Sequence, residues 1–143
     1  VGLENDIIAV FEKIGSDFAK HLVNKAADYD LETLVSDVFD ILAQYAVGCL
    51  FIEKNQFDFK FLAEHYRAYR KKFLETMTQY LTAFVESGKV RPLEQLELTT
   101  TLIIEILSWW AMDIRYTSFE TQDIPPELAK KICIDNIISA YKS

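Results

Sequence analysis

Histidine and cysteine, which supply most metal ligands and many nucleophiles, are scarce in this sequence. The two histidines, His21 and His65, fall on different predicted helices, and neither has a second metal ligand one helical turn away. The two cysteines, Cys49 and Cys133, form no metal-binding or redox spacing. We therefore expect no metal and no cofactor, and we interpret both cysteines as buried free thiols.

Motifs for catalysis are also missing. The sequence contains no glycine-rich phosphate loop and no Gly-x-Ser-x-Gly nucleophile elbow. Its 22 acidic residues fall mainly on polar helix faces, where solvated carboxylates are a simpler interpretation than a general acid–base pair. We predict that the chain is not an enzyme.

Aromatic side chains with polar tips are the remaining candidates for binding chemistry. His65, Tyr66 and Tyr69 lie together on one long predicted helix, and Trp109-Trp110 lie on a later one. Such residues line apolar pockets that carry a few directional hydrogen-bonding groups. They also fill ordinary cores, and the residue types alone favour a filled core.

Asp113 is a charged residue in line with an apolar helix stripe. Its carboxylate either pairs with Arg115 or a neighbouring helix, or it recognises a cationic group. We favour pairing, because an unpaired buried charge is costly.

Charge and composition exclude several classes of function. Residues 65–73 are basic and aromatic, but their aromatic side chains follow an apolar stripe, so a solvated helix face is a better interpretation than nucleic-acid binding. The net charge of −7 also disfavours contact with phosphates. No apolar run approaches the roughly 18 residues of a membrane span, and no signal peptide is evident. We expect a cytoplasmic protein that does not contact a membrane.

Apolar residues at spacings of three and four predict helices throughout. With four glycines and three prolines, breaks are few, so the helices are long. We predict an all-α antiparallel bundle of about five to six helices that forms one domain over residues 1–143. The expected helices are residues 3–25, 30–47 with Asp30 as N-cap, a short helix or turn at 49–55, 57–87 with Gly88 after its end, one opened by Pro92, and a last one after Pro125-Pro126.

The helix that follows Pro92 has two apolar stripes. One contains Leu98, Leu102, Ile106 and Trp109, and the other contains Ile103, Leu107, Trp110 and Ile114. A helix of this kind is covered on both sides. The last two helices carry more apolar surface than one small bundle hides, which predicts burial against a second copy of the chain.

The segment Phe84-Val85-Glu86-Ser87-Gly88-Lys89-Val90-Arg91-Pro92, with an apolar helix and a closing helix after it, resembles the C-terminal domain of TetR-type transcriptional regulators. In that family a similar acidic-small-Gly-x-(Ile/Val/Leu)-Arg-Pro turn leads into the penultimate helix. The resemblance extends from Leu3 to the end of the chain, and residues 86–92 are its motif-like part.

One departure from the family pattern is clear. The family's N-terminal helix-turn-helix signatures do not occur here. The resemblance therefore implies that the chain starts at or near the linking helix and comprises the effector-binding and dimerisation part. DNA would be contacted only through a missing N-terminal domain.

The resemblance implies two sites. The last two helices of each subunit would form a four-helix dimer interface, and an unknown small apolar or aromatic effector would bind between the first helices and the long third one. Binding would change the arrangement of the first helix and thereby DNA binding. The alternative is a structural helical dimerisation or interaction module without a pocket. The ligand-binding candidates are Phe11, Tyr45, His65, Tyr66, Tyr69, Trp109 and Asp113; the dimer-interface candidates are Ile103, Ile106, Leu107, Trp110, Ile134 and Ile138.

Overall fold

The computed structural model describes residues 2–24, 28–119 and 123–143, and these are helical apart from turns and one isolated bridge between Val90 and Lys142. This confirms the predicted all-α fold. The elements are α1 (Gly2–Asn24), α2 (Leu31–Gln44), α3 (Ala46–Lys54), α4 (Lys60–Glu86), α5 (Leu96–Ser108), the π-helical turn η1 (Trp109–Asp113), α6 (Ile114–Tyr116) and α7 (Pro126–Tyr141).

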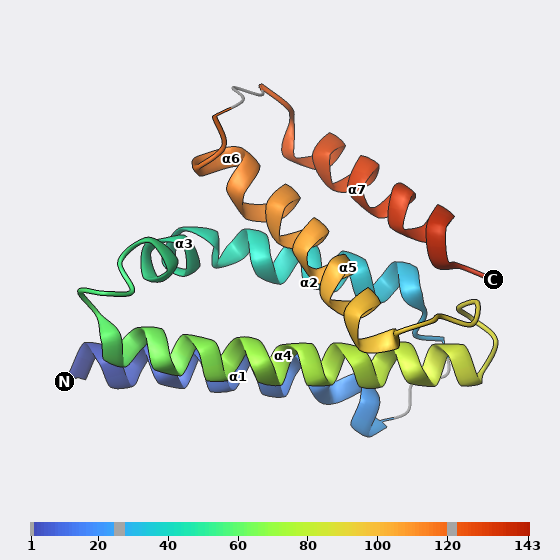
Figure 1. Cartoon of the computed structure of the whole chain (residues 1–143), viewed down its shortest axis with the longest axis horizontal. Coiled ribbons are helices and arrows are strands. Elements are labelled where there is room, and N and C mark those ends of the chain that lie inside the picture. Colours follow the sequence, from blue (N-terminus) through green and yellow to red (C-terminus); the bar gives the residue numbers. More distant parts are fainter. Residues whose placement is uncertain (1, 25–27, 120–122) are drawn as a thin grey trace.

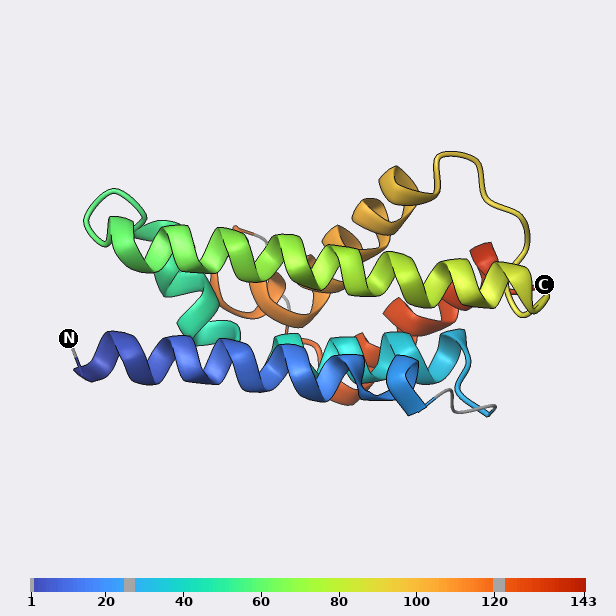
Figure 2. The same ribbon diagram turned by 90° about the horizontal axis from the view of Figure 1, so that it is seen from below.

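The two longest helices, α1 and α4, lie side by side along the length of the molecule, as Figures 1 and 2 show. They run in the same direction, because Phe11 stacks on Tyr69 and Phe18 stacks on Phe73 further along both helices. After α1, helices α2 and α3 lead the chain back to the end of the molecule where α1 began, and α4 starts there. Helix α5 then leads back obliquely away from the end of α4, and α7 runs across the top of the bundle (Figure 1).

The core is centred on α2. This helix packs against α5, η1 and α7 and has buried residues on several sides. Fully burying a Leu, Val or Phe side chain contributes about 1.5–3 kcal/mol, so the buried side chains of α2 are a main source of stability. Its buried residues are Leu31, Leu34, Val35, Val38, Phe39 and Leu42.

Two of the predicted helix boundaries are confirmed by their geometry. The Asp30 carboxylate accepts a hydrogen bond from the Thr33 amide at 2.9 Å, as an N-cap does. Gly88 has φ +79° just after α4, the left-handed conformation that glycine adopts at low cost. The ambiguous segment at 49–55 belongs to a true helix, α3.

The predicted start of the fifth helix is wrong. Pro92 does not open it; α5 begins at Leu96, after Gln95 with φ 49°. The reason is tertiary. The Arg91 amide donates to the Tyr141 carbonyl at 3.0 Å and Val90 bridges Lys142, so this segment stays extended along the end of α7.

The π-helical turn η1 was not predicted. It widens the helix at Trp109–Asp113 and changes the direction in which the following side chains project. As a result Ala111 and Met112 are buried, whereas Trp109 is 45% exposed. The two regular stripes expected from the sequence therefore do not continue through this segment.

No single helix of the described chain is both long and apolar enough to cross a membrane. Helices α2 and α3 meet that criterion only together, across a 65° bend, by length and composition.

Candidate functional site

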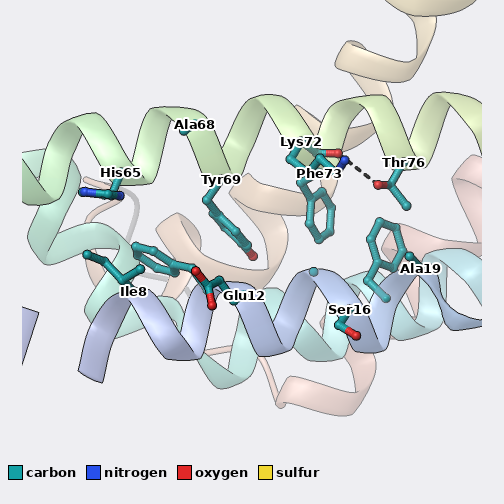
Figure 3. Close-up of a pocket in the computed structure, with 13 residues that line it drawn as sticks. Ile8, Glu12, Ser16, Ala19, His65, Ala68, Tyr69, Lys72, Phe73 and Thr76 are labelled. Atoms are coloured by element: carbon teal, nitrogen blue, oxygen red, sulfur yellow. Dashed lines mark hydrogen bonds between the residues drawn. The ribbon is translucent and has the colours of Figure 1, made fainter. Parts of the chain in front are cut away.

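A cavity of about 440 Å³ lies between α1 and α4. We call it the α1–α4 cavity. Residues one helical turn apart on each helix line it, and Figure 3 shows Tyr69 and Phe73 projecting from α4 toward α1. His65 lies toward one end of the cavity and Thr76 toward the other. Glu12 and Lys72 add charged groups to the lining, so this cavity has both apolar and polar walls.

A second cavity, of about 520 Å³, lies on the other side of α1. We call it the α3-side cavity, because α1, α3 and the start of α4 enclose it together with the end of α2. No Asp, Glu, Lys, Arg or His is among the described residues that line it. Its lining comprises Leu3, Ile7, Val10, Phe11, Ile14, Gln44, Tyr45, Val47, Gly48, Cys49, Phe51, Ile52, Phe59, Leu62 and Tyr69.

Phe11 and Tyr69 form the wall between the two cavities. Their rings stack with centroids 4.8 Å apart and planes 19° apart, and both residues line both cavities. Each volume falls within the range of about 300–1,000 Å³ that is usual for small-molecule pockets.

Five of the seven predicted ligand-binding residues lie at or beside these cavities. Phe11 and Tyr69 line both, His65 lines the α1–α4 cavity and Tyr45 lines the α3-side cavity. Tyr66 lies just behind the wall, with its ring centroid 6.0 Å from that of Phe11.

The structure places Trp109 and Asp113 away from both cavities. They belong to η1, which packs on α2, α3 and α7 rather than along α1. The Asp113 carboxylate accepts a hydrogen bond from the Thr117 hydroxyl at 3.1 Å, not from Arg115. Neither residue lines either cavity, because the π-turn directs this segment elsewhere.

The tyrosines at the wall are neutral hydrogen-bond donors. Burial raises the pKa of Tyr69 and of Tyr66 far above the ordinary tyrosine value. The Tyr66 hydroxyl donates to the Glu53 carboxylate at 2.5 Å, which ties α4 to α3. Burial also raises the pKa of the Cys49 thiol, so that it stays protonated and unreactive at neutral pH.

Sequence reasoning did not identify several cavity residues, notably Ile8, Val47, Phe51 and Phe59. Ile8 lies one position beside the apolar stripe of α1, in the place where a groove wall rather than the core is expected. Phe59 belongs to the Phe57-x-Phe59-x-Phe61 pattern that extends into the first turn of α4, a concentration of exposed aromatic residues that could have indicated a binding surface.

The residues predicted for the dimer interface divide into two groups. Ile103, Leu107 and Ile134 are 0%, 0% and 8% exposed, because they pack inside the chain's own core. Ile106, Trp110 and Ile138 are half-buried. The large apolar side chains that α5, η1 and α7 expose are instead Leu98, Leu102, Trp109, Leu128 and Ile132.

In the described part of the chain, no group of three or more His, Cys, Asp and Glu residues is arranged to hold a metal ion. The arrangement offers apolar volume, aromatic surface and a few neutral donors, which suits non-covalent binding. No protein-family model matches the chain, and no curated protein sequence is significantly similar to it.

Proposed function

We propose that this chain is the ligand-sensing and dimerisation domain of a TetR-like one-component transcriptional regulator of the cytoplasm. A small apolar or aromatic effector would bind beside α1. DNA would be read by a helix-turn-helix outside these 143 residues, and the chain itself would carry out no catalysis. The order of helices and the turn at residues 86–92 support this proposal, because both are similar to those of the family.

The observation that carries the proposal is the pair of cavities beside α1. A helix that lies against unfilled volume on two sides can take up more than one position, and a ligand that prefers one position shifts the population toward it. In the family that this chain resembles, the corresponding helix links the sensor to the DNA-binding domain.

Exposed apolar side chains on α5, η1 and α7 support the dimer. Leu98, Leu102 and Trp109 are 67%, 53% and 45% exposed, and burying them against a second copy would remove them from water. A two-fold contact requires the same patch on both copies, which these helices can supply.

The alternative function is an interaction module without a small-molecule ligand. It is favoured by the exposed phenylalanines Phe51, Phe57, Phe59 and Phe61 around α3 and the start of α4. A patch of this kind is typical of a protein-binding surface.

Binding of the neutral dye N-phenyl-1-naphthylamine tests the proposal. We expect saturable binding of one dye per chain. The variant Gly48→Leu places a side chain where Gly48 has open space in the lining of the α3-side cavity, and we expect it to weaken binding at least tenfold. Leucine also favours a helix more than glycine does, so α3 is preserved.

Two matched variants complete the experiment. Ala83→Leu, on the exposed face of α4, should leave dye affinity unchanged. If Phe57→Ser abolishes dye binding while Gly48→Leu does not, the dye binds the exposed phenylalanines and the interaction module replaces the sensor.

A further inference from the structure

The two cavities are separated by a wall that is one ring pair thick. Phe11 contributes from α1 and Tyr69 from α4, and each ring has cavity on both sides. Phe11 is only half-buried, so its ring has space into which it can turn. Beyond their mutual stack, Phe11 has one further ring neighbour, Tyr66 at 6.0 Å, whereas Tyr69 has two, Tyr66 at 6.1 Å and Phe73 at 5.9 Å, so Tyr69 is held more firmly.

The surroundings of the wall are held unequally. Beyond it, Phe18 is buried, stacks on Phe73 at 4.4 Å, and accepts a hydrogen bond at its carbonyl from the Tyr80 hydroxyl. Before it, Leu3 and Val10 of α1 are exposed. The packing of Phe18 therefore resists movement of α1 on one side of Phe11, whereas little packing resists it on the other side.

The linings of the two cavities differ in chemistry. The α3-side cavity has no charged side chain among its described lining residues, so it offers no counter-ion to a charged ligand. The α1–α4 cavity is lined by Ser16 and by Thr76, whose hydroxyl donates to the Lys72 carbonyl at 3.0 Å and still offers an acceptor, and by charges of opposite sign at Glu12 and Lys72. Together they fit a long molecule with an apolar body and a neutral hydrogen-bonding end.

We propose that the two cavities form one bipartite site for an elongated, neutral, apolar molecule. The Phe11 ring acts as a gate between them, and its displacement joins the cavities. The gate determines specificity by length. Short molecules occupy the α3-side cavity alone, whereas long ones turn Phe11 aside and extend into the α1–α4 cavity. This inference rests on the proposed function, since it requires that the α3-side cavity bind a small molecule.

Competition of 1-octanol and 1-dodecanol against N-phenyl-1-naphthylamine tests the gate. Gly15 lines the α1–α4 cavity and has open space around it, so Gly15→Leu fills that cavity while keeping α1 helical. We expect Gly15→Leu to weaken dodecanol binding at least tenfold and to leave octanol unchanged. Gly48→Leu should weaken both alcohols, because it fills the cavity that both use.

Removing the gate should have the opposite effect. Phe11→Ala joins the cavities without displacement of a stacked ring, so dodecanol should bind about two- to tenfold more tightly, the range that corresponds to one aromatic stack. Phe61→Ala removes a ring that lines neither cavity and should have no effect. The two glycine variants keep the test valid if Phe11→Ala does not fold.

The outcomes separate this inference from the proposed function. Octanol binding that Gly48→Leu weakens supports the sensor proposal. If Gly15→Leu then leaves dodecanol affinity unchanged, the cavities act independently and the gate is overturned while the sensor proposal stands. If neither alcohol competes with the dye in the unmodified chain, the bipartite site is overturned, whereas the sensor proposal is overturned only if the dye itself fails to bind or is unaffected by Gly48→Leu.

Discussion

Arg91 illustrates what a single residue does in this fold. Its Nε donates to the Ala140 carbonyl at 2.8 Å, and its guanidinium lies 5.4 Å from the centroid of the Tyr141 ring. The positive charge therefore sits at the C-terminal end of α7, where helix carbonyls are otherwise unsatisfied. The Arg-Pro part of the motif thus joins the α4–α5 turn to the last helix.

We predict that Arg91→Ala lowers the free energy of unfolding by about 1 kcal/mol, since a charged hydrogen bond and a helix-end interaction are lost together. Urea unfolding followed by circular dichroism measures this. Arg115→Ala removes an arginine whose neighbour is the adjacent Tyr116 ring, and it should change stability by less than half as much. Equal effects of the two variants would contradict the role assigned to Arg91.

Cys133 makes stability depend on pH in the alkaline range. Burial raises the pKa of its thiol from 9.0 to about 11. The unfolded chain therefore releases this proton at lower pH than the folded one, so the stabilisation is complete below pH 9 and is lost as the pH rises through about 11. We expect Cys133→Ala to lose less stability than the unmodified chain between these pH values.

Urea unfolding at both ends of that range gives the comparison. Ser139→Ala, at an exposed position of the same helix, should retain the full alkaline loss. If Cys133→Ala and the unmodified chain lose stability in parallel, the thiol does not titrate as its burial requires.

At the scale of elements, helix ends decide how the bundle is connected. Gly88 ends α4 in a left-handed conformation, and the next amides return to the helix: those of Lys89 and Val90 both donate to the Phe84 carbonyl, at 2.8 and 3.2 Å. The Lys89 ammonium donates to the Tyr29 carbonyl at 2.8 Å. This one turn therefore contacts both the α1–α2 connection and the end of α7.

Two glycine substitutions should have opposite signs. Gly88→Ala places a β-carbon on a residue with φ +79°, which costs about 1–2 kcal/mol although no atom lies within 4 Å of it. Gly48→Ala, inside α3 and equally free of clashes, should stabilise by about 0.5–1 kcal/mol. Thermal unfolding compares them, and stabilisation by Gly88→Ala would contradict the strained-turn interpretation.

At the scale of the whole molecule, apolar surface remains at two places. One is the end formed by α3 and the starts of α1 and α4, where the α3-side cavity opens; the other is the outer side of α5, η1 and α7. We propose a ligand for the first and a second copy of the chain for the other. The residue that best distinguishes these roles is Leu102, which is exposed on α5 and lines neither cavity.

We predict that Leu102→Glu converts a dimer to a folded monomer, because its charge would be buried unpaired in the interface. Sedimentation velocity measures the assembly, and circular dichroism verifies the fold. Ile103→Glu should unfold the chain instead, since Ile103 is fully buried within it. Phe57→Glu, at the opposite end, should remain dimeric; a monomer from Phe57→Glu alone would place the interface there.

Much of the fold could be predicted because helix signals are local. Asp30, Gly88 and Pro126 act on the backbone within a few residues, so the sequence predicts where α2 begins, where α4 ends and where α7 begins. The start of α5 could not be predicted, because the extended segment before it pairs with residues about fifty positions away in the chain.

The candidate site was only partly predictable. Phe11, His65 and Tyr69 follow the apolar rhythm of two helices, and aromatic residues of this kind indicate either a core or a pocket. Which of the two applies depends on how closely α1 and α4 approach, and that distance is a property of the packed bundle. Trp109 and Asp113 lie away from the cavities because a π-turn changes the helical period without a clear sequence signal.

The sequence by itself determined that the chain is helical, where most helices end, and which residues are apolar, since these depend on side-chain chemistry and local backbone preference. The tertiary structure decided which apolar residues are left over after the core is filled. Ile103 and Leu107 entered the core, whereas Leu102 and Trp109 did not, and Phe11 met Tyr69 with a cavity on either side. Packing fills space by shape and long-range contact, so apolar character alone does not assign a residue to core, pocket or partner surface.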